Sequence, residues 1–235
     1  MFKKIFITFL LFFISNNIKC QNNKFSLQFN YLSNIIFQET QYNANIYTIK
    51  KNMIGGFDFG MIINTELNFK NKKSFFELES GITYSKVKYL TTLDLNTNSK
   101  YNIETNFRTY NIPLQFIIKV KLKDKVTGKM GIGNIISICP SDIYSEYVEN
   151  NDFINNEFYE ISYYTNRLQN NLTSSLGVNY KNDKHEFYFG IKVIRPYKKT
   201  EFSTIYFDHI KTGEQQIILD LYKNLFVFEI KYYLP

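Results

Sequence analysis

The sequence predicts an all-β fold: an eight-stranded antiparallel up-and-down transmembrane β-barrel with short periplasmic turns and longer extracellular loops. Three observations predict it, namely a strand-forming composition, eight segments in which polar and apolar side chains alternate, and connections that alternate in length. The 23 Phe and 19 Tyr residues favour strands. After residue 20, no segment approaches the eighteen consecutive apolar residues expected of a membrane-spanning helix.

Residues 1–20 have the layout of a secretory signal peptide. Lys3 and Lys4 supply the positive end, and the apolar run 5–14 follows them. Ten apolar residues would span only about half of a bilayer as a helix, so a membrane anchor is the weaker interpretation.

Cleavage is expected between Cys20 and Gln21, which leaves 21–235 as the outer-membrane barrel domain. The alternative, lipidation of Cys20, would want small residues where Ile18 and Lys19 stand. With the leader removed, Cys139 is the single cysteine, so no internal disulfide is expected.

The net charge does not indicate a nucleic-acid partner. Part of the formal charge of +7 belongs to the three lysines of the leader, so the mature chain carries +4. The basic residues are spread along the chain, whereas nucleic-acid binding needs a clustered patch.

The alternation is clearest in residues 110–122. One face of this segment is apolar or aromatic along its whole length, and the other face is mostly polar, as only an extended strand allows. The apolar face consists of Tyr110, Ile112, Leu114, Phe116, Ile118, Val120 and Leu122. Seven further segments show the same pattern: 25–31, 57–69, 76–85, 126–136, 168–180, 187–193 and 226–232.

The connections between these segments alternate between tight polar turns and long polar stretches. The predicted turns are 71–74, 123–125 and 181–184. The predicted long loops are near 38–52, 91–100, 139–162 and 197–218. A chain that starts and ends on the short-turn side needs an even number of strands, and outer-membrane barrels have their short turns in the periplasm. Both termini are therefore expected to be periplasmic.

A soluble lipocalin-like ligand-binding barrel also alternates and stays open as an alternative. The leader, the strand lengths and the placement of tyrosines favour the membrane. An amphipathic ring is at home at the membrane–water interface. The tyrosines expected in such girdles are Tyr31, Tyr84, Tyr89, Tyr110, Tyr180 and Tyr232.

The segment Thr109-Tyr110-Asn111-Ile112-Pro113-Leu114-Gln115-Phe116-Ile117-Ile118-Lys119 resembles the Tyr-x-x-Pro-Leu strand of the Bacteroidetes porin-like outer-membrane β-barrel domain family. In that family a tight turn and a Gly-rich strand follow, and here Gly128, Gly131 and Gly133 stand there. The layout of the whole mature chain is similar, but only residues about 107–137 contain a recognisable motif. The resemblance implies an outer-membrane location and leaves the function open.

The polar faces of the eight segments predict a network of buried charges inside the barrel. Charges of both signs neutralise each other there, because an unpaired buried charge is costly. A structural role is therefore preferred to acid–base catalysis by a pair such as Glu77 and Glu79. The predicted lumen residues are Asp58, Glu66, Glu77, Glu79, Lys119, Lys121, Lys129, Glu186, Lys192, Glu229 and Lys231.

Catalytic, metal and cofactor sites are not predicted. The two histidines, His185 and His209, each fall in a predicted turn or loop, and a metal site needs three or four ligands. A lipid-modifying barrel enzyme would use His185 with Glu186 and Ser174 or Ser175, but His185 falls on the side away from the outer leaflet.

The expected function is that of a non-enzymatic outer-membrane barrel with an envelope-structural or surface-interaction role through its outer loops. Exposed aromatic residues mark interaction sites, and those expected in the loops are Tyr144, Tyr147, Phe153 and Phe158. The expected partners are outer-membrane lipid, lipopolysaccharide, the barrel-assembly machinery, and an envelope protein or surface ligand of unknown identity. A secretion or gliding component similar to PorT-like barrels and a lipid-modifying enzyme are the alternatives.

Overall fold

The computed structural model describes a set of ranges that covers most of the chain: residues 18–34, 40–44, 47–69, 76–95, 99–146, 153–198, 201–209, 212–221 and 224–235. Nearly all of the predicted leader, the turn 71–74 and Tyr147 lie outside these residues. No helix in the described ranges is long and apolar enough to cross a membrane.

The described residues form antiparallel strands joined by short connections. Their bounds are β1 (Ile18–Asn34), β2 (Thr40–Asn43), β3 (Tyr47–Phe69), β4 (Phe76–Leu95), β5 (Ser99–Lys123), β6 (Val126–Ile138), β7 (Ile143–Glu146), β8 (Phe153–Tyr164), β9 (Leu168–Lys181), β10 (Glu186–Pro196), β11 (Glu201–His209), β12 (Gly213–Leu221) and β13 (Leu225–Tyr233). The predicted all-β fold is confirmed.

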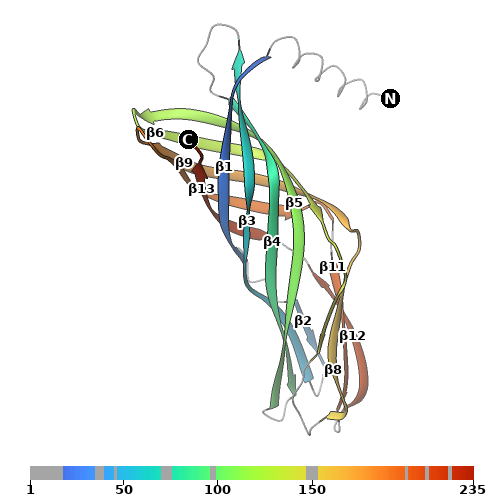
Figure 1. Ribbon diagram of the computed structural model, residues 1–235. Helices are drawn as coiled ribbons and strands as arrows, with labels where there is room; N and C mark the ends of the chain where they lie inside the picture. Colours follow the sequence, from blue (N-terminus) through green and yellow to red (C-terminus); the bar gives the residue numbers. More distant parts are fainter. Residues whose placement is uncertain are drawn as a thin grey trace, which may run out of the picture.

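Eight of these strands pair in a ring, in the order β1-β3-β4-β5-β6-β9-β10-β13 (Figure 1). β1 pairs with β3 on one side and with β13 on the other, so the ladder returns to its first strand. Each of the eight strands contains one of the eight segments predicted from alternation. The barrel strands were therefore predicted correctly.

The ring is staggered, as a barrel of tilted strands must be. On β5, Tyr110 is the partner of Tyr84 of β4. Following paired residues from Tyr84 in the opposite direction, through β3, β1, β13, β10, β9 and β6, leads to Val120 on β5. The ladder thus closes ten residues further along β5.

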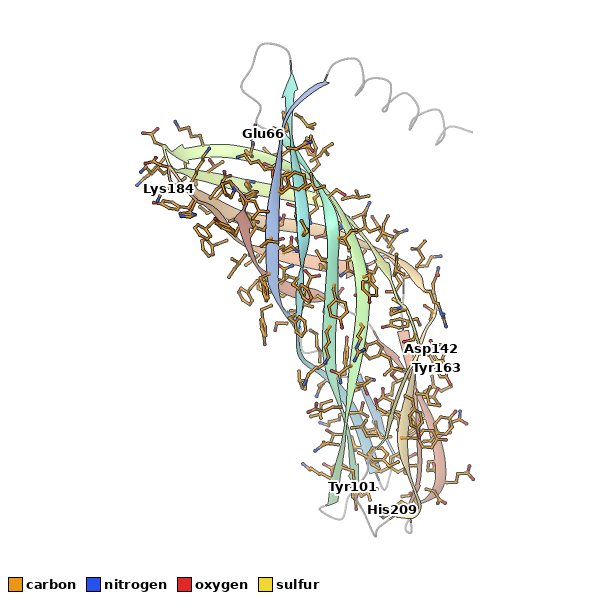
Figure 2. The ribbon with its side chains drawn as sticks, in the orientation of Figure 1. Glu66, Tyr101, Asp142, Tyr163, Lys184 and His209 are labelled. Carbon is orange, nitrogen blue, oxygen red and sulfur yellow. The ribbon has the colours of Figure 1, made fainter. Side chains whose placement is uncertain are left out.

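Where the structure describes the four predicted long loops, most of their residues belong to strands, so the prediction of irregular loops was wrong for these residues. β3, β4 and β5 continue beyond the barrel, and β2 pairs with β3. Opposite them, β12, β11, β8 and β7 form a second sheet. We call this part the extension, and the opposite end, with the connections 124–125 and 182–185, the turn end. Figure 2 shows Glu66 and Lys184 at the turn end and Tyr101 and His209 in the extension.

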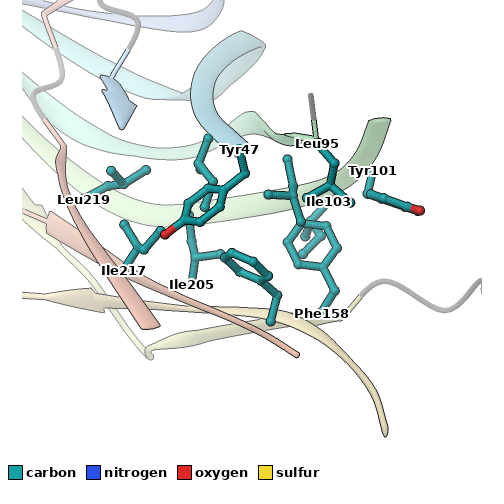
Figure 3. Close-up of a cluster of buried hydrophobic side chains, with 11 residues drawn as sticks. Tyr47, Leu95, Tyr101, Ile103, Phe158, Ile205, Ile217 and Leu219 are labelled. Atoms are coloured by element: carbon teal, nitrogen blue, oxygen red, sulfur yellow. The ribbon is translucent and has the colours of Figure 1, made fainter. Parts of the chain in front are cut away.

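The extension folds because its two sheets bury an apolar core between them (Figure 3). The buried residues come from both sheets: Tyr47, Ile49, Leu93, Leu95, Tyr101, Ile103, Phe158, Ile205, Phe207, Ile217 and Leu219. Burying such a set away from water stabilises a sandwich, whereas polar loops would have no core of their own.

Candidate functional site: the outer belt and the barrel interior

The outer surface of the barrel is a belt of exposed apolar side chains. Its members are aromatic or aliphatic on every strand of the ring, for example Phe29, Phe59, Ile82, Phe116, Ile132, Leu176, Phe189 and Phe228. Ile82 is 66% exposed and Phe29 is 64% exposed. A soluble barrel holds such residues in a dry interior, so this distribution is opposite to that of the lipocalin-like alternative.

Tyrosines lie at the borders of this belt. At the extension end, the rings of Tyr84 and Tyr110 are 5.6 Å apart, and the ring of Tyr31 lies 6.5 Å from that of Phe228. Tyr180 is exposed at the turn end. Tyr89, which was predicted to belong to a girdle, is buried because its odd position on β4 points it inward.

The polarity of the two faces inverts along single continuous strands. On β4, the inward residues change from Glu77, Glu79 and Thr83 in the barrel to Leu93 and Leu95 in the extension. Outward residues change in the opposite sense on both β4 and β5. On β4 they pass from Leu78, Ile82 and Tyr84 to Lys86 and Lys88; on β5 they pass from Leu114 and Tyr110 to Arg108 and Glu104. The switch occurs just beyond the Tyr84–Tyr110 pair, so one strand passes through two different surroundings.

A β-bulge in β3 matches this strand to its neighbours. The pairing with β4 shifts between Met53 and Gly55, which makes Ile54 the extra residue, and Gly55 has a φ of 138°. Odd positions face inward before the bulge, as in Lys51, and even positions face inward after it, as in Asp58. The bulge therefore reverses which face of β3 looks inward.

Inside the barrel, four charges from three strands form a buried chain. Lys231 contacts both Glu79 and Glu229, with a nitrogen–oxygen distance of 3.2 Å to Glu229. Lys192 binds the same Glu229 carboxylate at 2.6 Å. The exposed fraction of each of these side chains is 3% or less. Alternating signs satisfy each charge where water is excluded.

A second group of charges lies at the turn end of the interior. Lys119 binds Glu66 at 2.7 Å, and Lys129 binds Glu77 at 3.1 Å. Lys24, which the sequence analysis did not include, binds Glu186 at 3.0 Å. These residues line a mouth of about 400 Å³.

One predicted member of the lumen network lies elsewhere. Lys121 is 66% exposed at the edge of the turn end, where it pairs with Asp124 in the adjoining turn. The strand bulges directly after it, between Lys121 and Lys123, so regular alternation ends at this residue.

Asp58 is buried, and none of the cationic side chains that the structure describes forms an ion pair with it. Gln28 and Asn30 donate to Oδ1 at 3.2 and 2.9 Å. Thr83 and Ser85 donate to Oδ2 at 2.7 and 3.1 Å, and Asn111 donates to the same oxygen at 3.2 Å. The expectation that opposite charges neutralise the lumen residues is therefore wrong for Asp58, whose charge is held by neutral donors.

Tyr188 fills the interior because glycines lie beside it. A Cβ atom at Gly190 would come within 2.3 Å of the Tyr188 hydroxyl, and one at Gly177 within 2.6 Å of the ring. The Lys231 ammonium lies over the Tyr188 ring, 5.1 Å from the ring centroid. The Tyr188 ring thus occupies the space that side chains at the two glycine positions would otherwise need.

An apolar layer closes the interior toward the extension. It consists of the buried residues Leu32, Val87, Tyr89, Phe107, Cys139, Tyr164 and Val227. Between this layer and the Asp58 group lies a small cavity of about 50 Å³, lined in part by Asn111 and Gln169. The interior is filled, as expected of an eight-stranded barrel.

Beyond this layer, Lys51 and Glu160 form a buried ion pair that the sequence did not reveal. Ser203 accepts from the Lys51 ammonium at 2.8 Å, while Ser162 and Thr91 donate to the Glu160 carboxylate at 2.7 and 2.5 Å. Burial alone would raise the pKa of Glu160, but the Lys51 charge and the donated hydrogen bonds hold this pKa below its ordinary value. The pair joins β3 to β8 across the extension.

The predicted contact residues are divided by the fold. Tyr144 is 58% exposed on β7. Phe158 is 0% exposed and packs in the core of the extension, so its prediction as an exposed contact was wrong. Tyr147 lies outside the described residues, as does the side chain of Phe153.

The structure does not assemble the trio considered for lipid chemistry. His185 is exposed in the turn, and its Nδ1 lies 3.1 Å from the Tyr232 hydroxyl. Ser174 is the partner of Val193, eight residues along the chain from His185. Ser175 points inward and donates to Gln115. The other histidine, His209, is buried on β11 and does not lie in a loop.

These features define a class of protein: a ring of eight antiparallel strands with an apolar outer belt, a filled polar interior and a folded extension at one end. No family model and no curated protein matches the chain. Among solved structures, the outer membrane protein OprG from Pseudomonas aeruginosa is similar, with a TM-score of 0.49 and 9% identity over 92% of this chain and 97% of that chain. The family indicated by residues 107–137 stays a prediction.

Proposed function

We propose that this chain is a non-enzymatic outer-membrane barrel that holds a folded module at the cell surface. The observation that supports this most directly is the inversion of polarity along β4 and β5. Apolar side chains face outward where lipid would surround the barrel, and they face inward where water would surround the extension. A single solvent around the whole molecule gives no reason for such a switch.

The orientation proposed for the barrel has the extension outside the cell and the turn end in the periplasm. Outer-membrane barrels usually have short connections on their periplasmic side and long connecting segments on their extracellular side. The C-terminal residue Pro235 follows β13 at the turn end (Figure 1). The leader predicted from residues 1–20 supports export to this compartment.

A role in surface interaction is proposed for the outer face of the second sheet. Aromatic rings form cross-strand pairs there, with centroid distances of 4.8 Å for Tyr159–Tyr206 and 5.1 Å for Tyr163–Phe202. Tyr144 and Ile218 are 58% and 63% exposed on the same face. Exposed apolar patches on otherwise polar surfaces mark interaction sites.

Cell fractionation with heat-modifiable gel mobility tests the location. The chain is expected in the outer-membrane fraction, with a compact gel band that shifts only after boiling. Protease added to intact cells at a dose high enough to digest folded surface domains is expected to remove the extension and to spare the barrel strands. A soluble chain, or a band that never shifts on boiling, would refute the proposal.

A further inference from the structure

The arginines of this chain are confined to one border of the molecule. Of its 28 basic residues, only Arg108, Arg167 and Arg195 are arginines. All three are exposed, and each stands where a barrel strand meets the extension: within β5, directly before β9 and near the end of β10. The guanidinium group binds phosphate through two parallel hydrogen bonds, which lysine cannot reproduce.

At this border, Arg108 lies directly opposite another cation. It is the cross-strand partner of Lys86, and both residues are on the outer face, one pair beyond Tyr84 and Tyr110. Directly opposed residues have Cβ atoms about 4.5–5.5 Å apart, and like charges at this distance destabilise a sheet.

The same strands neutralise their other outer cations. Lys88 pairs with Glu104 at 3.6 Å, and Lys100 pairs with Asp94 at 3.3 Å. Within the described ranges, no ion pair joins Lys86 or Arg108 to an acid. On its other side Lys86 faces Phe57 of β3. Lys86 and Arg108 can therefore bind an anion that is not part of these strands.

A cleft begins beside Arg108 and offers room for such a group. Its volume is about 330 Å³, and its lining includes Asn106, Ser141 and Tyr144, which supply polar atoms. Asp142 also lines it, and its carboxylate lies 3.8 Å from Arg167. Toward the barrel, the outer face continues as the tyrosine pair and the apolar belt.

We propose that Lys86 and Arg108 bind the phosphate of a phosphate-bearing membrane lipid. The acyl chains of such a lipid lie along the belt below Tyr110, and its headgroup extends toward the cleft at Asn106. This inference deepens the proposed function and rests on it, because the two cations meet a headgroup only if the belt is in lipid. The bound phosphate relieves the repulsion between the two cations.

Lipid binding to the full chain in a zwitterionic detergent tests this proposal. The probes are phosphatidic acid, diacylglycerol with the same acyl chains, and inorganic phosphate, each followed by native mass spectrometry. The unmodified chain is expected to bind phosphatidic acid about tenfold or more tightly than diacylglycerol. The double variant Lys86→Gln with Arg108→Gln is expected to lose this preference. The control variant, Lys123→Gln with Lys181→Gln, removes the same charge at the turn end and should keep it.

A second variant separates binding from folding. Arg108→Glu places opposite charges on the two strands, so it should raise the temperature at which the compact gel band disappears while abolishing the lipid preference. A lower temperature would show that the cation pair is not strained and would overturn the proposal. An unchanged preference in the double variant, or inorganic phosphate binding as tightly as the lipid, would overturn it as well. If the unmodified chain fails to enter neutral lipid vesicles, the proposed membrane location itself fails.

Discussion

Asp58 accepts hydrogen bonds from side chains on three neighbouring strands, β1, β4 and β5. Five neutral donors divide one negative charge between them, and each is fixed by the register of its strand. Hydrogen bonds to an ionised group are stronger than neutral ones, and a buried partner that is left unsatisfied costs more than the bond itself contributes. A single carboxylate can thus fix the relative positions of four strands.

Replacing Asp58 by Asn should therefore destabilise the barrel. The new amide nitrogen would face hydrogen-bond donors and could not accept from them. The free energy of unfolding should therefore fall by about 1–3 kcal/mol. The control is Asp183→Asn in the exposed turn 182–185, which should have almost no effect. The temperature of the heat-modifiable transition measures both. Equal temperatures for the two variants would show that the donors around Asp58 reorganise freely.

Lys51 and Glu160 give the extension a dependence on pH. Because the folded state lowers the pKa of Glu160, the stabilisation from this pair is present at neutral pH. It is lost as the pH falls below the ordinary carboxylate value of 4.5 and through the lowered pKa.

Acidification should therefore weaken β8 and β11 before the barrel. Urea titrations at several pH values, read by a hydrogen-exchange pulse at fixed pH, measure this. In the variant Glu160→Gln, the free energy of unfolding at neutral pH should be lower by about 3–5 kcal/mol, because Lys51 stays buried without its partner. Its stability should also vary less with pH than that of the unmodified chain. Both proteins contain His209, so the difference between them isolates Glu160; parallel pH profiles would contradict the assignment.

At the scale of elements, the bulge at Ile54 decides which face of β3 enters the core of the extension. β4 and β5 pass from barrel to extension without changing which positions face inward. β3 changes from even to odd positions at the bulge, so that Tyr47, Ile49 and Lys51 face the second sheet. Because side chains alternate with a period of two, one extra residue exchanges the two faces.

Deleting Ile54 together with Asn52 should disrupt the extension and spare the barrel. Loss of the bulge residue alone leaves Met53 opposite Tyr89 and Gly55 opposite Lys88, so the faces of β3 stay as they are. The second deletion moves the chain before Met53 by one position, which turns Lys50 inward and Lys51 outward and leaves Glu160 without its cation. Limited proteolysis should then cut β8 and β11, while the heat-modifiable shift of the barrel remains. The control is the deletion of Ile54 alone, which keeps the pairing with β4 and should leave the extension resistant. Protease resistance of the double deletion would show that β3 can be paired in another register.

At the scale of the whole molecule, two surfaces with similar exposure lie in different proposed surroundings. Ile132 on the barrel is 60% exposed, and Ile218 on the second sheet is 63% exposed. If lipid surrounds the belt and water surrounds the extension, exposure alone does not set the cost of a charge at these positions.

The matched substitutions Ile132→Arg and Ile218→Arg test this distinction. Arginine on the lipid face near the middle of a barrel costs about 2–4 kcal/mol. At an exposed position in water, the effect should stay within about 0.5 kcal/mol. Urea unfolding of the chain in phospholipid vesicles measures both values. Equal small effects would mean that the belt faces water.

How far the sequence predicted the fold depends on the range of the interactions involved. The segment containing Phe116 and Ile118 could be assigned to a strand with an apolar face from its neighbours alone, because alternation is a local property. Glu79, Lys192, Glu229 and Lys231 could be placed inside for the same reason. Lys121 was misplaced because a bulge beside it ends the alternation.

The extension could not be predicted in this way. Residues 139–162 contain enough Asn, Ser and Glu to resemble a polar loop, and their alternation has the opposite sense to that of the barrel. Phe158 was therefore taken as exposed, although it lies in the core with Ile205 and Leu93. The pair of Lys51 and Glu160 spans 109 residues of sequence, so no local pattern signals it.

The sequence by itself determined the eight barrel strands and their lipid-type and lumen-type faces, because a strand shows its two environments in every second residue. Tertiary structure alone decided that the outer segments form a sandwich, that Ile54 reverses one strand and that Lys86 meets Arg108. Each of these depends on which strands become neighbours and in which register. Pairing energies are set between distant segments, so no single segment contains that information.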